Sequence, residues 1–135
     1  MKGAPDLDLE TVMGAARDAS RSAYAPYSNF HVGAAILTED GTIHAGCNVE
    51  NASYGLSICA ERNAAAAMAL ANPEGREIRL VAVSSLDASP CFPCGACRQV
   101  LREFGCKEVV VEGESGFRRY PFEEILPHAF GPKGL

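Results

Sequence analysis

Residues 78–112 read IRLVAVSSLDASPCFPCGACRQVLREFGCKEVVVE, and this stretch decides the fold. It opens with a largely apolar run over 78–85, which is typical of a buried central strand. A loop rich in proline and cysteine follows, and then come a helical pattern over 95–104 and a second strand over 107–112. This order predicts a strand–helix–strand unit, the element from which parallel sheets are built.

The segment before this unit carries a helix and a hairpin. Apolar residues recur at three- and four-residue steps over 7–22, which predicts an amphipathic helix: Leu9, Val12, Met13, Ala16 and Ala19. Strands are expected over 31–38 and 42–48, because the Asp40-Gly41 pair between them is a strong hairpin signal.

Three more elements complete the predicted order. The alanine-rich stretch 59–71 predicts a helix, which the sequence Asn72-Pro-Glu-Gly75 would end. A short last strand over 117–120 and a helical turn over 121–126 close the chain. We therefore expect one domain over 1–135 of the α/β class: a three-layer α-β-α sandwich around one mixed five-stranded sheet.

Composition narrows the class of protein. The 135 residues carry a formal net charge of -5, and nucleic-acid binders usually present a basic surface, so no nucleic-acid partner is expected. Acidic residues interrupt the N-terminal segment at once, and no apolar run is long enough to cross a bilayer. We expect a cytoplasmic protein with no membrane partner. Its six cysteines are then better explained as ligands, catalytic groups or core residues than as disulfides.

Three of these cysteines stand where helices are predicted to begin. Cys94 and Cys97 are spaced to grip one metal ion, and a helix N-terminus stabilises thiolates. Cys59 opens the earlier helix, and successive helices on one face of such a sheet bring their N-termini to the same edge. Three thiolates on one Zn²⁺ leave the fourth tetrahedral position open for water, which is typical of a catalytic site. Glu61 lies two residues after Cys59, where a carboxylate could take a proton from that water.

The quoted motifs resemble those of a known family. Cys59-Ala-Glu61 followed by Pro93-Cys-Gly-Ala-Cys97 is similar to the zinc deaminase signature, in the version with cysteine as first ligand. Four longer motifs resemble the short, homotetrameric cytidine deaminases: YAPYSNFHVGAA from Tyr24, NVENASY from Asn48, CAERNA from Cys59 and LPHAFGP from Leu126. The likeness runs from about Tyr24 to Pro132.

The resemblance implies a role for each matching residue. Cys59, Cys94 and Cys97 would hold one zinc ion per subunit, and Glu61 would carry protons to N3 of cytosine and then to the departing amino group. The implied substrate is cytidine or deoxycytidine as the free nucleoside. The implied contacts with it are as follows: Asn48 and Glu50 on the ribose 3′-hydroxyl, Phe30 on the pyrimidine, the Ala60 backbone on the base, and Tyr54 and Phe130 reaching into a neighbouring subunit's pocket.

Three thiolates would give the zinc site a formal net charge of -1, which weakens zinc as a Lewis acid. Arg62 directly follows Glu61 and could donate hydrogen bonds to the ligand sulfurs, which would draw charge off the metal. The resemblance supports this role.

Alternatives remain open at this stage. Cys91 creates a second two-residue spacing with Cys94, so Cys59, Cys91, Cys94 and Cys97 could form a closed four-thiolate zinc site in a structural module. We prefer the Cys94–Cys97 pair, because Pro93 precedes it and a helical pattern follows, and we take Cys91 as a bystander. Cys47 and Cys106 are expected as small buried residues, and a nucleic-acid editing or blasticidin-type deaminase is the nearest rival in chemistry.

Overall fold

The computed structural model describes residues 5–134. The helices and strands follow the order α1 (Pro5–Ser20), β1 (Val32–Thr38), β2 (Ile43–Cys47), α2 (Ala60–Ala71), β3 (Ile78–Ser85), α3 (Gly95–Glu103), β4 (Glu108–Gly113), β5 (Gly116–Pro121) and α4 (Phe122–Ile125). Two short 3-10 helices, η1 (Tyr54–Leu56) and η2 (Pro132–Gly134), lie in the connecting and terminal segments.

The five strands form one mixed sheet in the order β2-β1-β3-β4-β5. Strand β1 is antiparallel to both of its neighbours, β2 and β3, and β3 is parallel to β4. Strand β5 closes the edge as an antiparallel partner of β4. The parallel pair is the strand–helix–strand unit that the sequence predicts over 78–112.

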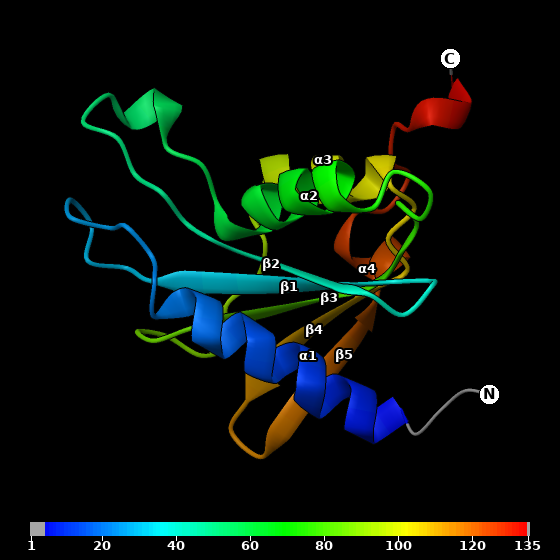
Figure 1. Cartoon of the computed structure of the whole chain (residues 1–135), viewed down its shortest axis with the longest axis horizontal. Helices are drawn as coiled ribbons and strands as arrows, with labels where there is room; N and C mark the ends of the chain where they lie inside the picture. The colour runs from blue at the N-terminus through cyan, green and yellow to red at the C-terminus, as the bar shows by residue number, and fades with distance from the viewer. Residues whose placement is uncertain (1–4, 135) are drawn as a thin grey trace.

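The sheet is covered on both faces (Figure 1), with α1 on one face and α2 and α3 on the other. Alternate residues of each central strand face opposite layers. In β1, Ala35 and Leu37 pack in the cluster that contains the α1 residues, whereas Ala34 and Ile36 pack in the cluster that contains the α2 residues. The predicted fold class, a three-layer sandwich around a mixed five-stranded sheet, is confirmed.

Two strand glycines let helices approach the sheet closely. A Cβ at Gly33 would lie 2.0 Å from the Ala16 carbonyl oxygen of α1. On the other face, a Cβ at Gly46 would lie 2.4 Å from the Ala64 backbone nitrogen of α2. Since real Cβ atoms do not come so near backbone atoms, only glycine permits these two contacts. The contact at Gly46 holds the first turns of α2 directly against the sheet.

The turn between β1 and β2 is held by one carboxylate. Asp40 accepts hydrogen bonds from the Thr38 and Thr42 hydroxyl groups and from the Asn72 side chain that follows α2. These bonds lower the pKa of Asp40 to about 2, and the bond from Thr38 has the largest effect. The predicted Asp40-Gly41 hairpin is confirmed, and its turn is tied to the end of α2.

The element boundaries differ by a few residues from those predicted. Helix α1 spans Pro5–Ser20 rather than 7–22, and α2 begins at Ala60 with Cys59 as its N-cap residue. The last strand is longer than predicted, Gly116–Pro121, and α4 is confined to Phe122–Ile125. None of the helices over the described residues 5–134 is long and apolar enough to cross a membrane.

Replacing Gly33 with alanine is expected to destabilise the fold, because the new methyl group would push α1 away from β1. Overpacking of this kind costs about 1–3 kcal/mol of unfolding free energy. Gly14→Ala in α1 is the matched control: its Cβ would have nothing within 4 Å, so the change should raise stability by up to about 1 kcal/mol. Denaturant unfolding of the two variants measures both effects, and equal stability of Gly33→Ala and the parent would contradict the packing described here.

Candidate active site

The direction of the strands brings two helix N-termini to one edge of the sheet. Strands β2 and β3 are both antiparallel to β1, so they run in the same direction, and β4 runs with them. Helices α2 and α3 follow β2 and β3 in the chain and cover the same face. Both therefore begin beyond the carboxyl ends of these strands. Their N-cap residues are Cys59 and Cys94, each in extended backbone conformation.

Three thiols meet at this point. The Cys94 sulfur lies 3.6 Å from that of Cys59 and 3.5 Å from that of Cys97, and all three ligand atoms are within 4.8 Å of one another. Sulfurs that bind one zinc ion at about 2.3 Å in tetrahedral geometry are about 3.8 Å apart. The cluster therefore fits a single Zn²⁺ with three protein ligands. The prediction that sulfurs from two helix ends converge is supported by these distances.

Glu61 lies in the first turn of α2 beside the thiols. Its side chain is only 3% exposed, and its Oε1 is 3.7 Å from the Cys97 sulfur. Burial, and next the negative charge of the Cys59 thiolate, raise the pKa of Glu61 to about 7. A carboxyl group with such a pKa can both accept and release a proton near neutral pH.

Arg62 also contacts the cluster. Its Nη2 donates a hydrogen bond to the Cys59 sulfur at 3.4 Å. The Cys97 thiol and Arg62 both stabilise negative charge on Cys59 and lower its pKa. The Arg62 Nε is the one buried side-chain nitrogen in the described part of the chain that has no hydrogen-bond partner. The predicted contact between Arg62 and a ligand sulfur is present in the structure.

A cavity of about 200 Å³ opens over the cluster. Its walls come from the residues around the start of β1, the residue after β2, the first turn of α2 with its N-cap residue, and the loop before α3. The lining residues are Phe30, Val32, Asn48, Cys59, Ala60, Glu61, Cys91, Phe92 and Cys94. Four residues predicted to bind substrate or carry protons therefore share one cavity with two of the predicted ligands: Phe30, Asn48, Ala60 and Glu61.

Cys91 lies in the wall of the cavity over the thiols. It is not part of the three-thiol cluster, in agreement with the preferred ligand set, but it lines the cavity and is half-buried. Burial, and next the charge of Glu61, raise the pKa of its thiol to about 11. Cys91 thus lies in the loop and outside the thiol cluster, as predicted, and the structure adds that its neutral thiol forms part of the cavity wall. Phe92 and Val32 were not singled out from the sequence at all.

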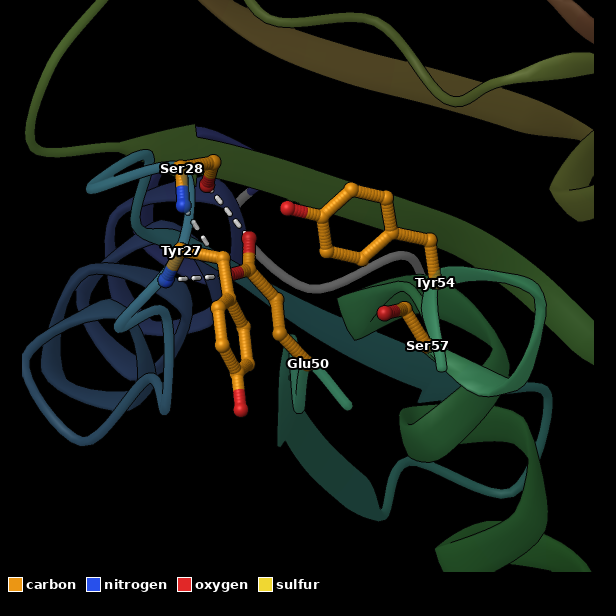
Figure 2. A pocket seen from close by; sticks show the side chains of 5 residues that line it. All are labelled: Tyr27, Ser28, Glu50, Tyr54 and Ser57. Carbon is orange, nitrogen blue, oxygen red and sulfur yellow. Dashed lines mark hydrogen bonds between the residues drawn. The ribbon is translucent and has the colours of Figure 1, made fainter. Parts of the chain in front are cut away.

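Glu50 and Tyr54 line a second cavity, of about 290 Å³, together with Tyr27, Ser28 and Ser57. Figure 2 shows the Glu50 carboxylate pointing toward the chain at Tyr27 and Ser28. Its Oε1 accepts the backbone N–H groups of Tyr27 and Ser28 at 3.1 Å each, and its Oε2 accepts the Ser28 hydroxyl. These bonds lower the pKa of Glu50, and the bond from the Ser28 hydroxyl has the largest effect.

The other predicted contacts are placed as follows. Asn48 accepts the Val32 backbone N–H at 2.9 Å and donates to the Phe30 carbonyl at 2.8 Å. Tyr54 and Phe130 are 74% and 64% exposed, and Phe130 lines neither of the two cavities. The roles of these residues on a substrate stay predictions.

The two cysteines outside the site, Cys47 and Cys106, differ in burial. Cys106 is buried as expected, but Cys47, at the end of β2, is only half-buried, so that expectation is wrong. All six cysteines are free thiols.

Comparison with known proteins identifies the family. The family model described as the cytidine and deoxycytidylate deaminase zinc-binding region matches residues 7–113. The chain belongs to this family. A cytidine deaminase of Mycobacterium tuberculosis is 46% identical over 129 residues, which is 94% of this chain and 92% of that protein. One of Sporosarcina psychrophila is 41% identical over 133 residues, 96% of each chain.

Solved structures of this deaminase family have the same fold. The crystal structure of a cytidine deaminase from Burkholderia pseudomallei superposes with a TM-score of 0.80 and 46% identity, over 90% of this chain and 98% of that chain. Membership confirms the expected resemblance, the enzyme prediction and the zinc cofactor. The alternative of a structural four-thiolate module is therefore wrong.

Two serine substitutions test whether Cys94, and not Cys91, is a zinc ligand. Cys91→Ser should keep one zinc ion per chain, because Cys91 lies outside the cluster. Cys94→Ser should lose zinc on dialysis, since it removes one of the three clustered sulfurs. Metal analysis after dialysis against a weak chelator measures both, and zinc loss in Cys91→Ser would show that the ligand set is misassigned.

Proposed function

We propose that this chain hydrolytically deaminates free cytidine and deoxycytidine, which gives uridine or deoxyuridine and ammonia. One observation carries the proposal: the buried Glu61 carboxyl lies beside a cluster of three thiols, and two of these thiols, Cys59 and Cys94, line one small cavity with it. The relatives named above are cytidine deaminases, and each covers nearly the whole chain.

Zinc held by Cys59, Cys94 and Cys97 would supply Lewis-acid chemistry, since a zinc ion with an open position lowers the pKa of water to about 7. Glu61 would take up one proton of the attacking water and deliver it to N3 of the pyrimidine. It would then move the proton of the hydroxyl group added at C4 to the departing amino group. The low exposure of Glu61 keeps bulk water from competing for these protons. Arg62 would hold positive charge against the Cys59 sulfur and so offset the excess charge of three thiolates.

The two cavities suggest how a nucleoside would lie. We place the pyrimidine in the inner cavity, where Phe30 would pack on its face and the Ala60 backbone would hydrogen-bond its edge. The sugar would extend toward Asn48 and Glu50. Both side chains keep capacity for a ribose hydroxyl despite their backbone contacts, because a carboxylate has about four acceptor positions and an amide has two donors.

We further propose a homotetramer in which neighbours complete each active site. Tyr54 is on η1, in a segment that projects away from the sheet (Figure 1), and Phe130 precedes the C-terminal η2. Large aromatic side chains that remain exposed in one chain are typical of protein interfaces. Pyrimidine salvage in the cytoplasm is the setting that suits such a reaction, and six free thiols are consistent with a reducing compartment.

The Glu61→Gln variant tests the chemistry. It preserves the shape of the side chain and one acceptor oxygen but cannot take up a proton, so kcat should fall at least about 100-fold while zinc content stays at one ion per chain. The assay follows the loss of cytidine absorbance, with and without a zinc chelator.

The same assay is run with deoxycytidine, free cytosine and a short oligonucleotide. We expect turnover of cytidine and deoxycytidine and none of free cytosine or the oligonucleotide. A zinc-loaded Glu61→Gln enzyme with parental turnover would refute the role of Glu61, and turnover of the oligonucleotide alone would refute the substrate class.

A further inference from the structure

The start of β1 is fastened to the residues that follow β3. Asp87 Oδ2 accepts the His31 backbone N–H at 2.6 Å and lies 2.9 Å from the His31 ring nitrogen Nδ1. The Ser85 hydroxyl donates to the His31 carbonyl at 2.8 Å and accepts the Asp87 backbone N–H at 3.0 Å. The Leu86 backbone N–H also donates to the His31 carbonyl, at 3.1 Å. Both backbone polar groups and the ring of His31 are thus held by residues 85–87.

His31 directly follows Phe30, whose side chain lines the cavity over the thiols. Phe30 is 38% exposed and belongs to neither core cluster, so core packing does not fix its ring. Its backbone is fixed instead. The Phe30 N–H donates to the Ser28 hydroxyl at 3.0 Å, and its carbonyl accepts from Asn48 at 2.8 Å. The Asp87–His31 pair supplies the anchor on the other side of Phe30.

Asp87 itself does not line the cavity. Its carboxylate is partly exposed, and its bonds to the His31 backbone and ring lower its pKa, so it is charged at neutral pH. A surface pair of this kind adds little to global stability. Its effect on the geometry of the adjoining residue is therefore separable from its effect on folding.

We infer that Asp87 is a positioning residue for substrate binding: it holds His31 so that Phe30 faces the pyrimidine. The inference rests on the proposed deaminase function. An aromatic ring that packs on the base contacts the substrate and the transition state alike, so its displacement raises KM and leaves kcat nearly unchanged.

Asp87→Ala tests this, with Asp40→Ala as a matched control. Asp40 is also an exposed turn carboxylate with several hydrogen bonds, but it lies at the opposite end of β1 and lines neither of the two cavities described above. Steady-state kinetics with cytidine should show a KM about threefold to tenfold higher in Asp87→Ala, with kcat within about twofold of the parent. Asp40→Ala should keep the parental KM even where its melting temperature falls.

Asp87→Asn provides a second variant, because it keeps an oxygen for the His31 backbone N–H but loses the charge beside the ring. Its KM should lie between those of the parent and Asp87→Ala. A parental KM in Asp87→Ala overturns the inference, as does an equal rise in Asp40→Ala. If Asp87→Ala fails to fold, a parental KM in Asp87→Asn overturns it. Failure of the proposed function is distinct, since the parent would then not turn over cytidine at all.

Discussion

Two helices that follow strands of one sheet and cover the same face begin at the same edge when those strands run in the same direction. Here β2, β3 and β4 do so, and α2 and α3 begin at the same edge of the sheet. The second requirement is closeness. Gly46 has no side chain, and the buried face of α2 contains alanines, so the helix lies directly on the sheet. Cys59 and Glu61 take their positions from this contact.

The charge balance of the site follows from that arrangement. Bringing thiolates and a carboxyl group together in a buried place disfavours negative charge on Glu61 and raises its pKa, which suits a group that must pass protons in both directions. Arg62 offsets part of the charge on Cys59. The neutral thiol of Cys91 completes the wall without adding charge to it.

The sequence was sufficient to predict the fold, because each element has a local signal: apolar spacing in α1, an Asp-Gly turn between β1 and β2, and an apolar run in β3. The ligands could be predicted because their spacing places them at helix starts. The place of Cys91 and Phe92 in the cavity wall could not be predicted, since a loop carries no periodicity that tells which side chains face a cavity. The bonds from Glu50 to Tyr27 and Ser28, and from Asp87 to His31, likewise join residues whose proximity no local pattern encodes.

The central claim is that three sulfurs hold one zinc ion and leave a position open beside Glu61. X-ray absorption at the zinc edge of the purified protein measures this directly, because it counts sulfur and lighter ligands separately. The account predicts three sulfur ligands and one oxygen or nitrogen ligand per zinc ion. Four sulfur ligands, with Cys91 as the fourth, would mean a closed site with no place for the reacting water and would contradict it.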